Sequence, residues 1–196
     1  GVVGAVLVVN VVAALYLSFV HQRGPVVVAK RLSALAGAKG GGAMRVLFLT
    51  PCHATPFYSV VHHNISMQFL DCSPYGMRPS WPGYTLDAQC HSRQLPGGLL
   101  DWSVDGPFQY GDEDETARFF RSPVEFLHCA YGDGKGLDGA METPTHIVVF
   151  DEMAPRIEEF LRVFEYQELD AIFHAHIVLD DRTSQRMLVF GRDIKN

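Results

Sequence analysis

An uninterrupted hydrophobic segment opens the chain. Residues 1–20 carry no charged side chain, and Asn10 is their only strongly polar residue. About 20 apolar residues is the length that crosses the hydrocarbon core of a bilayer. Backbone amides in lipid must be satisfied within the segment, so the pattern predicts a transmembrane helix here. Aromatic and basic groups anchor such a helix at the membrane interface. Tyr16 and the sequence His-Gln-Arg at 21–23 lie at the end of the segment, where such anchors are expected.

A signal peptide and a buried helix of a soluble domain are the alternatives for this segment. A signal peptide normally begins with a charged region, whereas this chain begins Gly-Val-Val without Met. A buried helix normally keeps some polar positions over such a length. The length therefore favours the membrane span, and the missing initiator Met leads us to expect a part of a longer protein.

The pattern beyond residue 24 changes to short periodic segments. Helical spacing of apolar residues predicts an amphipathic helix over residues 25–36, and the glycine-rich residues 37–43 predict a flexible linker. Apolar runs predict strands over residues 45–50, 67–70, 146–150, 171–178 and 186–191. Helix signals predict helices that begin near residue 112 and over residues 123–129 and 154–164.

These elements divide the chain into three parts. Residues 1–24 hold the membrane helix, residues 25–44 the amphipathic segment and linker, and residues 45–196 an α/β domain. The strand–helix–strand order between residues 146 and 178 favours a short sheet packed by helices. Residues 75–111 are rich in Pro, Gly and Ser and predict a long irregular segment whose role the sequence does not indicate.

Charge is distributed unevenly along the chain. No Asp or Glu precedes Asp71, so all 22 acidic residues lie from there onward, and five basic residues precede it: Arg23, Lys30, Arg31, Lys39 and Arg45. An acidic domain lacks the basic face that nucleic-acid binding needs. The distribution instead suits a chain that leaves a membrane and then folds in water.

The four cysteines, Cys52, Cys72, Cys90 and Cys129, are widely spaced. They form no Cys-x-x-Cys pair, which argues against a structural zinc site, and we expect no bound metal. A Cys52–Cys72 disulfide in an oxidising compartment and four buried thiols are equally compatible with this spacing.

Six short blocks of sequence resemble one family of membrane glycosyltransferases, in the same order along the chain. They are VHQRG at 20–24, PCHATPFYS at 51–59 with His62, FLDCSP at 69–74, the Asp112-to-Leu127 block, PTHIV at 144–148 and FHAH at 173–176. They are similar to the GPI mannosyltransferases of the phosphatidylinositol-glycan class B type, in the Alg9-like group. Ala54 and Val60 depart from the family pattern, as do residues 25–43, and residues 75–111 have no counterpart in it.

The resemblance implies the C-terminal part of a multi-pass enzyme of the endoplasmic reticulum membrane. That enzyme would transfer the third, α-1,2-linked mannose from dolichol-phosphate mannose to the GPI-glycolipid precursor. The family's catalytic acids lie in a lumenal loop far upstream, so we expect no catalytic residue and no bound cofactor here, and an inactive fragment. Residues 1–24 would be the last membrane helix, and the following domain would lie in the lumen beside the upstream transmembrane part.

Two alternatives to this function stay open. The first is a related mannosyltransferase that works on N-glycan precursors, although the Cys-His-x-Thr-Pro block favours the GPI branch. The second is a membrane-tethered interaction domain without catalytic association.

The loop after the first strand holds the candidate binding residues Cys52, His53, Thr55, Tyr58 and His62. Their polar side chains can hydrogen-bond sugar hydroxyls or phosphate, so they could contact the acceptor or dock against the membrane part. A rigid turn that only shapes the domain is the favoured alternative. Asn64-Ile65-Ser66 is a glycosylation sequon, which functions only in a secretory lumen. The basic residues after the span indicate the cytosolic side instead, but that rule sums over loops outside this chain.

Two further groups invite a chemical role. His174 and His176 would share one face of the strand predicted over residues 171–178 and could bind a metal, but ordinary packing is favoured because no third ligand is evident. The acids at residues 112–115 fit the solvated start of a helix better than acid–base catalysis.

Overall fold

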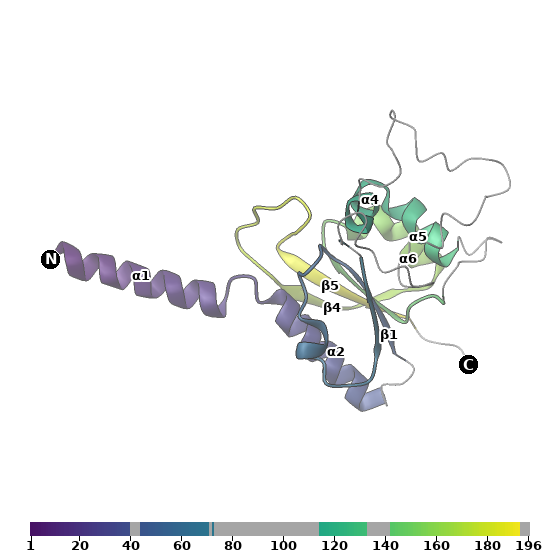
Figure 1. Cartoon of the computed structure of the whole chain (residues 1–196), viewed down its shortest axis with the longest axis horizontal. Coiled ribbons are helices and arrows are strands. Elements are labelled where there is room, and N and C mark those ends of the chain that lie inside the picture. Colours follow the sequence, from purple (N-terminus) through teal and green to yellow (C-terminus); the bar gives the residue numbers. More distant parts are fainter. Residues whose placement is uncertain (40–43, 71, 73–113, 133–141, 193–196) are drawn as a thin grey trace.

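The computed structural model describes residues 1–39, 44–70, 72, 114–132 and 142–192. Its N-terminal helix α1 (Val2–Phe19) projects away from the remainder of the chain (Figure 1). None of the residues of α1 is buried, so the alternative of a buried helix in a soluble domain is wrong for this fold. Its 18 residues rise about 27 Å at 1.5 Å per residue, close to the thickness of a bilayer core. Among the described residues it belongs to the one helical segment apolar and long enough to cross a membrane.

A five-stranded mixed sheet forms the centre of the domain. Its strands are β1 (Arg45–Leu49), β2 (Ser66–Phe69), β3 (His146–Phe150), β4 (Gln167–Phe173) and β5 (Arg186–Gly191). Their order across the sheet is β2-β1-β3-β5-β4. The pairs β1–β2 and β1–β3 are parallel, whereas β5 runs antiparallel to both β3 and β4. The expected mixed α/β class is confirmed.

Helices cover both faces of this sheet. Helix α2 (Gly24–Lys39) lies on one face, and α4 (Glu115–Arg121), α5 (Pro123–Tyr131) and α6 (Glu158–Val163) lie on the other (Figure 1). Alternate residues of β1 point to opposite faces, so Val46 and Phe48 join the α2 side while Leu47 and Leu49 join the other side. Burial on both faces explains why β1 and β3 are continuously apolar in sequence.

The boundaries of several elements differ from the sequence predictions. Helix α2 continues through Lys39, so residues 37–39 of the expected linker are helical, and residues 40–43 lie outside the described part. The helix expected over residues 154–164 begins as a 3-10 turn, Ala154–Ile157, before α6. The predicted irregular segment over residues 75–111 lies outside the described residues.

The strand predicted over residues 171–178 is wrong at both ends. Strand β4 runs from Gln167 to Phe173 and sits at the edge of the sheet, where four of its seven residues are exposed and Ile172 alone is buried. An edge strand with one open face tolerates polar residues, so the apolar run that marks a buried strand is missing here.

Candidate functional site

The candidate binding loop begins at the carboxyl end of β1. Because β1 and β2 are parallel, their carboxyl ends share one edge of the sheet, the edge at which open α/β sheets commonly bind ligands. Cys52 follows β1 and Cys72 follows β2, and a disulfide joins them with their Cα atoms 5.9 Å apart. Cys129 is also disulfide-bonded, so the alternative of four buried thiols is wrong. The disulfide ties together the two segments that leave this edge.

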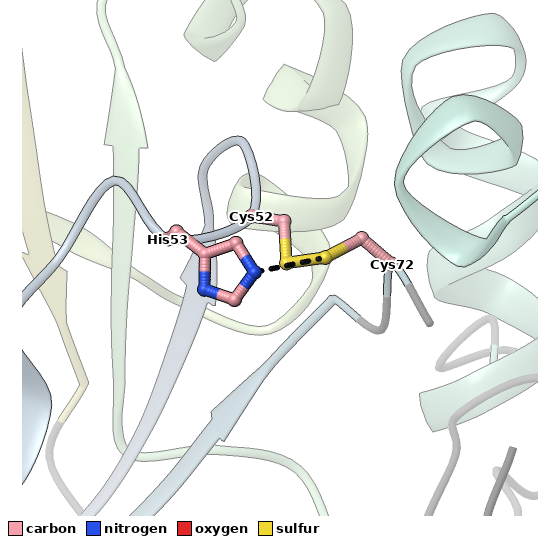
Figure 2. Close-up of side chains that lie close together, drawn as sticks. All are labelled: Cys52, His53 and Cys72. Carbon is pink, nitrogen blue, oxygen red and sulfur yellow. Dashed lines mark hydrogen bonds between the residues drawn. A yellow bond between two sulfur atoms is a disulfide. The ribbon is translucent and has the colours of Figure 1, made fainter. Parts of the chain in front are cut away.

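His53 lies directly against this disulfide. Figure 2 shows its imidazole pointing toward the sulfur atoms, with Nε2 3.6 Å from Sγ of Cys72. His53 is exposed, and its backbone has φ = 62°. Phe57, at the other end of the loop, has φ = 44°. A residue other than glycine in this region costs on the order of 1–3 kcal/mol, and such strained positions cluster at ligand and active sites.

The ligand atoms of Cys52, His53 and Cys72 lie within 4.8 Å of one another, a grouping that could hold a metal ion. The same two sulfur atoms form the disulfide, however. Zinc binds cysteine as the thiolate, and a disulfide sulfur offers none. We therefore assign the group as a covalent clamp with an adjacent imidazole.

The other residues of the predicted site divide into buried and exposed ones. Thr55 is 4% exposed, so its hydroxyl cannot reach a ligand outside the loop. Tyr58 donates a 2.6 Å hydrogen bond from its hydroxyl to the carbonyl of Ile65 while its ring stays exposed. His62 and Asn64 are both exposed. The side chains that remain available to a ligand are His53, His62 and the ring of Tyr58. Cys52, Thr55 and the hydroxyl of Tyr58 instead stabilise the loop or are buried in it.

Asp151, which the sequence analysis did not single out, lies at the same sheet edge, directly after β3. Its carboxylate accepts hydrogen bonds from the hydroxyl of Ser184 and from Nε of Arg186, the latter at 2.9 Å. Burial alone raises the pKa of Asp151, but these hydrogen bonds and the positive charge of Arg186 outweigh it, so the net pKa is lowered. An acid that directly follows a buried strand was the sequence signal for this position. Because Ser184 and Arg186 both bind its carboxylate, we assign Asp151 a structural role.

Replacing Asp151 with Asn is expected to lower the free energy of unfolding by about 1–2 kcal/mol, because it removes the charge from a hydrogen bond to Arg186. A folded-state pKa below the unfolded value contributes stability above about pH 4, and this stability is lost as the pH falls through the folded-state pKa. Urea denaturation at pH 7 and pH 3 should therefore show a smaller loss of stability on acidification in the variant. An equal loss in both proteins would contradict this role for Asp151.

The acids at residues 112–115 are only partly described. Asp114 caps α4 as expected, since its Oδ1 accepts a 2.7 Å hydrogen bond from the amide of Ala117. Glu115 is 1% exposed, so the expectation of a solvated helix start is wrong for this residue. Burial, with the charges of Tyr166 and Glu115, raises the pKa of Tyr131. Residues 112 and 113 lie outside the described part.

His174 and His176 do not share a strand face, because β4 ends at Phe173. His174 turns inward, packs edge-on against the ring of Phe150 and faces the backbone of Gly24. Burial and the neighbouring charge of His21 lower its pKa. His176 turns outward, and its Nδ1 lies 2.9 Å from the hydroxyl of Tyr16 on α1. Ordinary packing, the favoured alternative to a metal site, describes His174.

Two sequence blocks about 150 residues apart therefore meet where α1 joins the domain. Gly24 ends the first block and His174 belongs to the second. A Cβ atom on Gly24 would lie 3.0 Å from Cβ and 3.1 Å from Cα of His174, which leaves no room for one without movement of the backbone.

Replacing Gly24 with Ala is accordingly expected to destabilise the domain by about 1–3 kcal/mol, as other overpacked sites do. Gly37→Ala in the same helix is the matched control. Its Cβ would meet only the ring of His63, at 3.5 Å, and Ala favours a helix over Gly by up to about 1 kcal/mol. Urea denaturation of both variants should give shifts of opposite sign. Stabilisation by Gly24→Ala would contradict the close contact with His174.

The sequence of this chain is similar to those of one group of enzymes. GPI mannosyltransferase 3 of Drosophila melanogaster is 33% identical over 175 residues, which is 88% of this chain and 25% of that protein. The chain is homologous to the GPI mannosyltransferase 3 proteins. GPI alpha-1,2-mannosyltransferase 3 of Danio rerio is 28% identical over 190 residues, 96% of this chain and 28% of that protein. The Homo sapiens protein of the same name is 26% identical over 187 residues, 95% and 27% respectively.

The chain spans about a quarter of the length of these relatives. The similarity covers 88–96% of the chain in these three relatives. No protein-family model and no solved structure matches the chain.

Proposed function

We propose that this chain is the C-terminal part of a mannosyltransferase that adds the third, α-1,2-linked mannose to the GPI precursor. The donor is dolichol-phosphate mannose, and the enzyme acts in the endoplasmic reticulum membrane. The observation that carries the proposal is homology to the GPI mannosyltransferase 3 proteins over 88–96% of the chain. The exposed apolar helix α1 supports it, because a helix of this length and composition suits a surrounding of lipid.

In this proposal α1 is the last membrane helix, and the α/β domain stands on the lumenal face. The Cys52–Cys72 disulfide supports the lumen, since disulfides persist in oxidising compartments. Asn64 of the glycosylation sequon is exposed and therefore open to modification. The transfer chemistry belongs to the upstream part of the protein, beside which this domain is tethered.

The loop against the disulfide is proposed to contact the phosphoglycan acceptor through His53. Its imidazole is exposed at the carboxyl edge of the parallel strands, and its strained backbone is held by the clamp of Cys52 and Cys72. An imidazole can donate to or accept from sugar hydroxyls, and it can donate to phosphate.

His53→Ala in the full-length enzyme is expected to raise the KM for the GPI acceptor several-fold while leaving domain stability near the parent value. Tyr58→Phe is the matched control, because it removes a hydrogen bond to Ile65 and leaves the exposed ring. It should lower stability by about 0.5–1.5 kcal/mol and leave the KM unchanged. The binding role of His53 fails if His53→Ala lowers stability and leaves acceptor affinity normal.

Complementation tests the overall function. The full-length protein that carries this chain would be expressed in cells that lack the third-mannose transferase and accumulate a two-mannose GPI precursor. We expect surface display of GPI-anchored proteins to return and the two-mannose glycolipid to disappear. Persistence of that glycolipid, or repair of N-glycan precursors instead, would overturn the proposal.

A further inference from the structure

The loop between β4 and β5 exposes an apolar apex. Ile177 is 62% exposed and Leu179 is 94% exposed, more than any other large apolar side chain in the described part of the domain. Leu179 is even more exposed than Val2 of α1, at 81%. Ile177 and Leu179 are two positions apart in this loop. Exposed apolar patches are typical of membrane or protein contacts.

The conformation of this apex is held by its own hydrogen bonds. The carboxylate of Asp180 accepts a 2.9 Å hydrogen bond from the amide of Arg182. The backbone carbonyl of Asp180 accepts a 3.0 Å hydrogen bond from the amide of Thr183. The side chain of Arg182 also pairs with the Asp180 carboxylate, with Nε 3.2 Å from Oδ1. Gln185 donates to the carbonyl of His176 at 3.4 Å. The two apolar side chains are therefore presented by an ordered turn.

This turn is also attached to α1. The hydroxyl of Tyr16 lies 2.9 Å from Nδ1 of His176, and the two rings stack with their centroids 5.9 Å apart. Figure 1 shows the loop on the side of the domain from which α1 projects. Tyr16 is three residues before the end of α1, which corresponds to roughly 5 Å along the axis. Tyrosine at this place in a membrane helix sits at the interface, so His176 lies at that level too.

We propose that Ile177 and Leu179 insert into the lipid interface beside α1 and give the domain a second membrane contact. Their neighbour His176 is fixed to the last turn of α1, so the apex faces the same lipid layer that surrounds the end of that helix. Asp180 and Arg182, which follow at once, mark the level at which the chain returns to the headgroups. Shallow insertion of a few apolar side chains orients a domain at the membrane, as interfacial anchors do. This inference rests on the proposed membrane span of α1.

Collision accessibility of a spin label tests the insertion. The 196-residue chain would be reconstituted in phosphatidylcholine vesicles with a label on Leu179→Cys, a position whose exposure tolerates substitution. Val9→Cys in the middle of α1 is the lipid reference, and Glu158→Cys at the exposed start of α6 is the water reference. The parent chain without an added cysteine gives the background, since the described cysteines are all disulfide-bonded.

We expect the Leu179 label to collide several-fold more with oxygen, relative to a water-soluble nickel chelate, than the Glu158 label does. A water-like ratio at Leu179 together with a lipid-like ratio at Val9 would overturn the inference and leave the span of α1 intact. Low collision with both reagents at Leu179 would assign the apex to a protein contact and also overturn it. A water-like ratio at Val9 would refute the membrane span itself.

Discussion

Replacement of Cys52 and Cys72 by Ser is expected to lower the free energy of unfolding of the domain by roughly 3 kcal/mol. The disulfide closes a loop with a sequence separation of 20, and loops of that size lose about this much stabilisation when the unfolded chain is released. Domains of this size have a total stability of about 5–15 kcal/mol, so the loss is a large share of the whole. Urea denaturation of the chain in detergent, followed by circular dichroism, measures it.

The double variant is compared with each single variant to separate the cross-link from its side chains. Both singles should be at least as unstable as the double, because each leaves a thiol without its partner. A double variant that unfolds at the parent urea concentration would show that the loops after β1 and β2 do not depend on the clamp. In the full-length enzyme the double variant should also raise the KM for the GPI acceptor, because His53 loses its fixed position beside the disulfide.

Phe160→Ala is expected to destabilise the domain by about 3–5 kcal/mol, the usual cost of removing a buried aromatic ring. Phe160 of α6 is completely buried in the core that lies on the α4–α5–α6 side of the sheet. Its ring stacks with that of Tyr166, with centroids 6.2 Å apart, and lies 6.1 Å from the ring of Tyr131. Loss of the ring opens a cavity between α6, Tyr131 of α5 and Tyr166.

Phe164→Ala is the matched control for this cavity. Phe164 contacts the ring of Phe160, with centroids 4.6 Å apart, but is only partly buried at the rim of the same core. Its truncation should therefore cost less than that of Phe160. Equal losses in urea denaturation would contradict the position of Phe160 at the centre of the core.

The central strands and the N-terminal helix could be predicted from sequence because their environment leaves a strong pattern. Strands β3 and β5 coincide with their predicted ranges, and β1 is shorter by one residue at its end. Their residues are buried on both faces, so they read as continuous apolar runs. Helix α1 has no polar face, and its uniformly apolar composition marks its length.

Elements whose form depends on tertiary contacts could not be predicted. Strand β4 is polar because it lies at the sheet edge, and it ends where His174 turns inward to Gly24. Glu115 looked like part of a solvated acidic run but is 1% exposed in the fold. Helix α2 extends through Gly37 because its apolar face continues against the sheet as far as Ala36.

The candidate site was predictable in place but not in arrangement. An apolar strand followed by Pro-Cys-His indicated a loop at a sheet edge, which is where it lies. Spacing alone did not decide the partner of Cys52, since the parallel pairing of β1 and β2 brings Cys72 to it. The same pairing determines that His53 faces the disulfide, whereas the burial of Thr55 follows from how the loop folds back on the sheet.

A direct mannose-transfer assay tests whether the full-length protein adds the third mannose to the GPI precursor. Membranes that contain the full-length protein would receive labelled dolichol-phosphate mannose and a GPI precursor with two mannoses. We expect a glycolipid longer by one labelled mannose, which an α-1,2-specific mannosidase removes. Absence of that product, or transfer of the label to an N-glycan precursor, would contradict it.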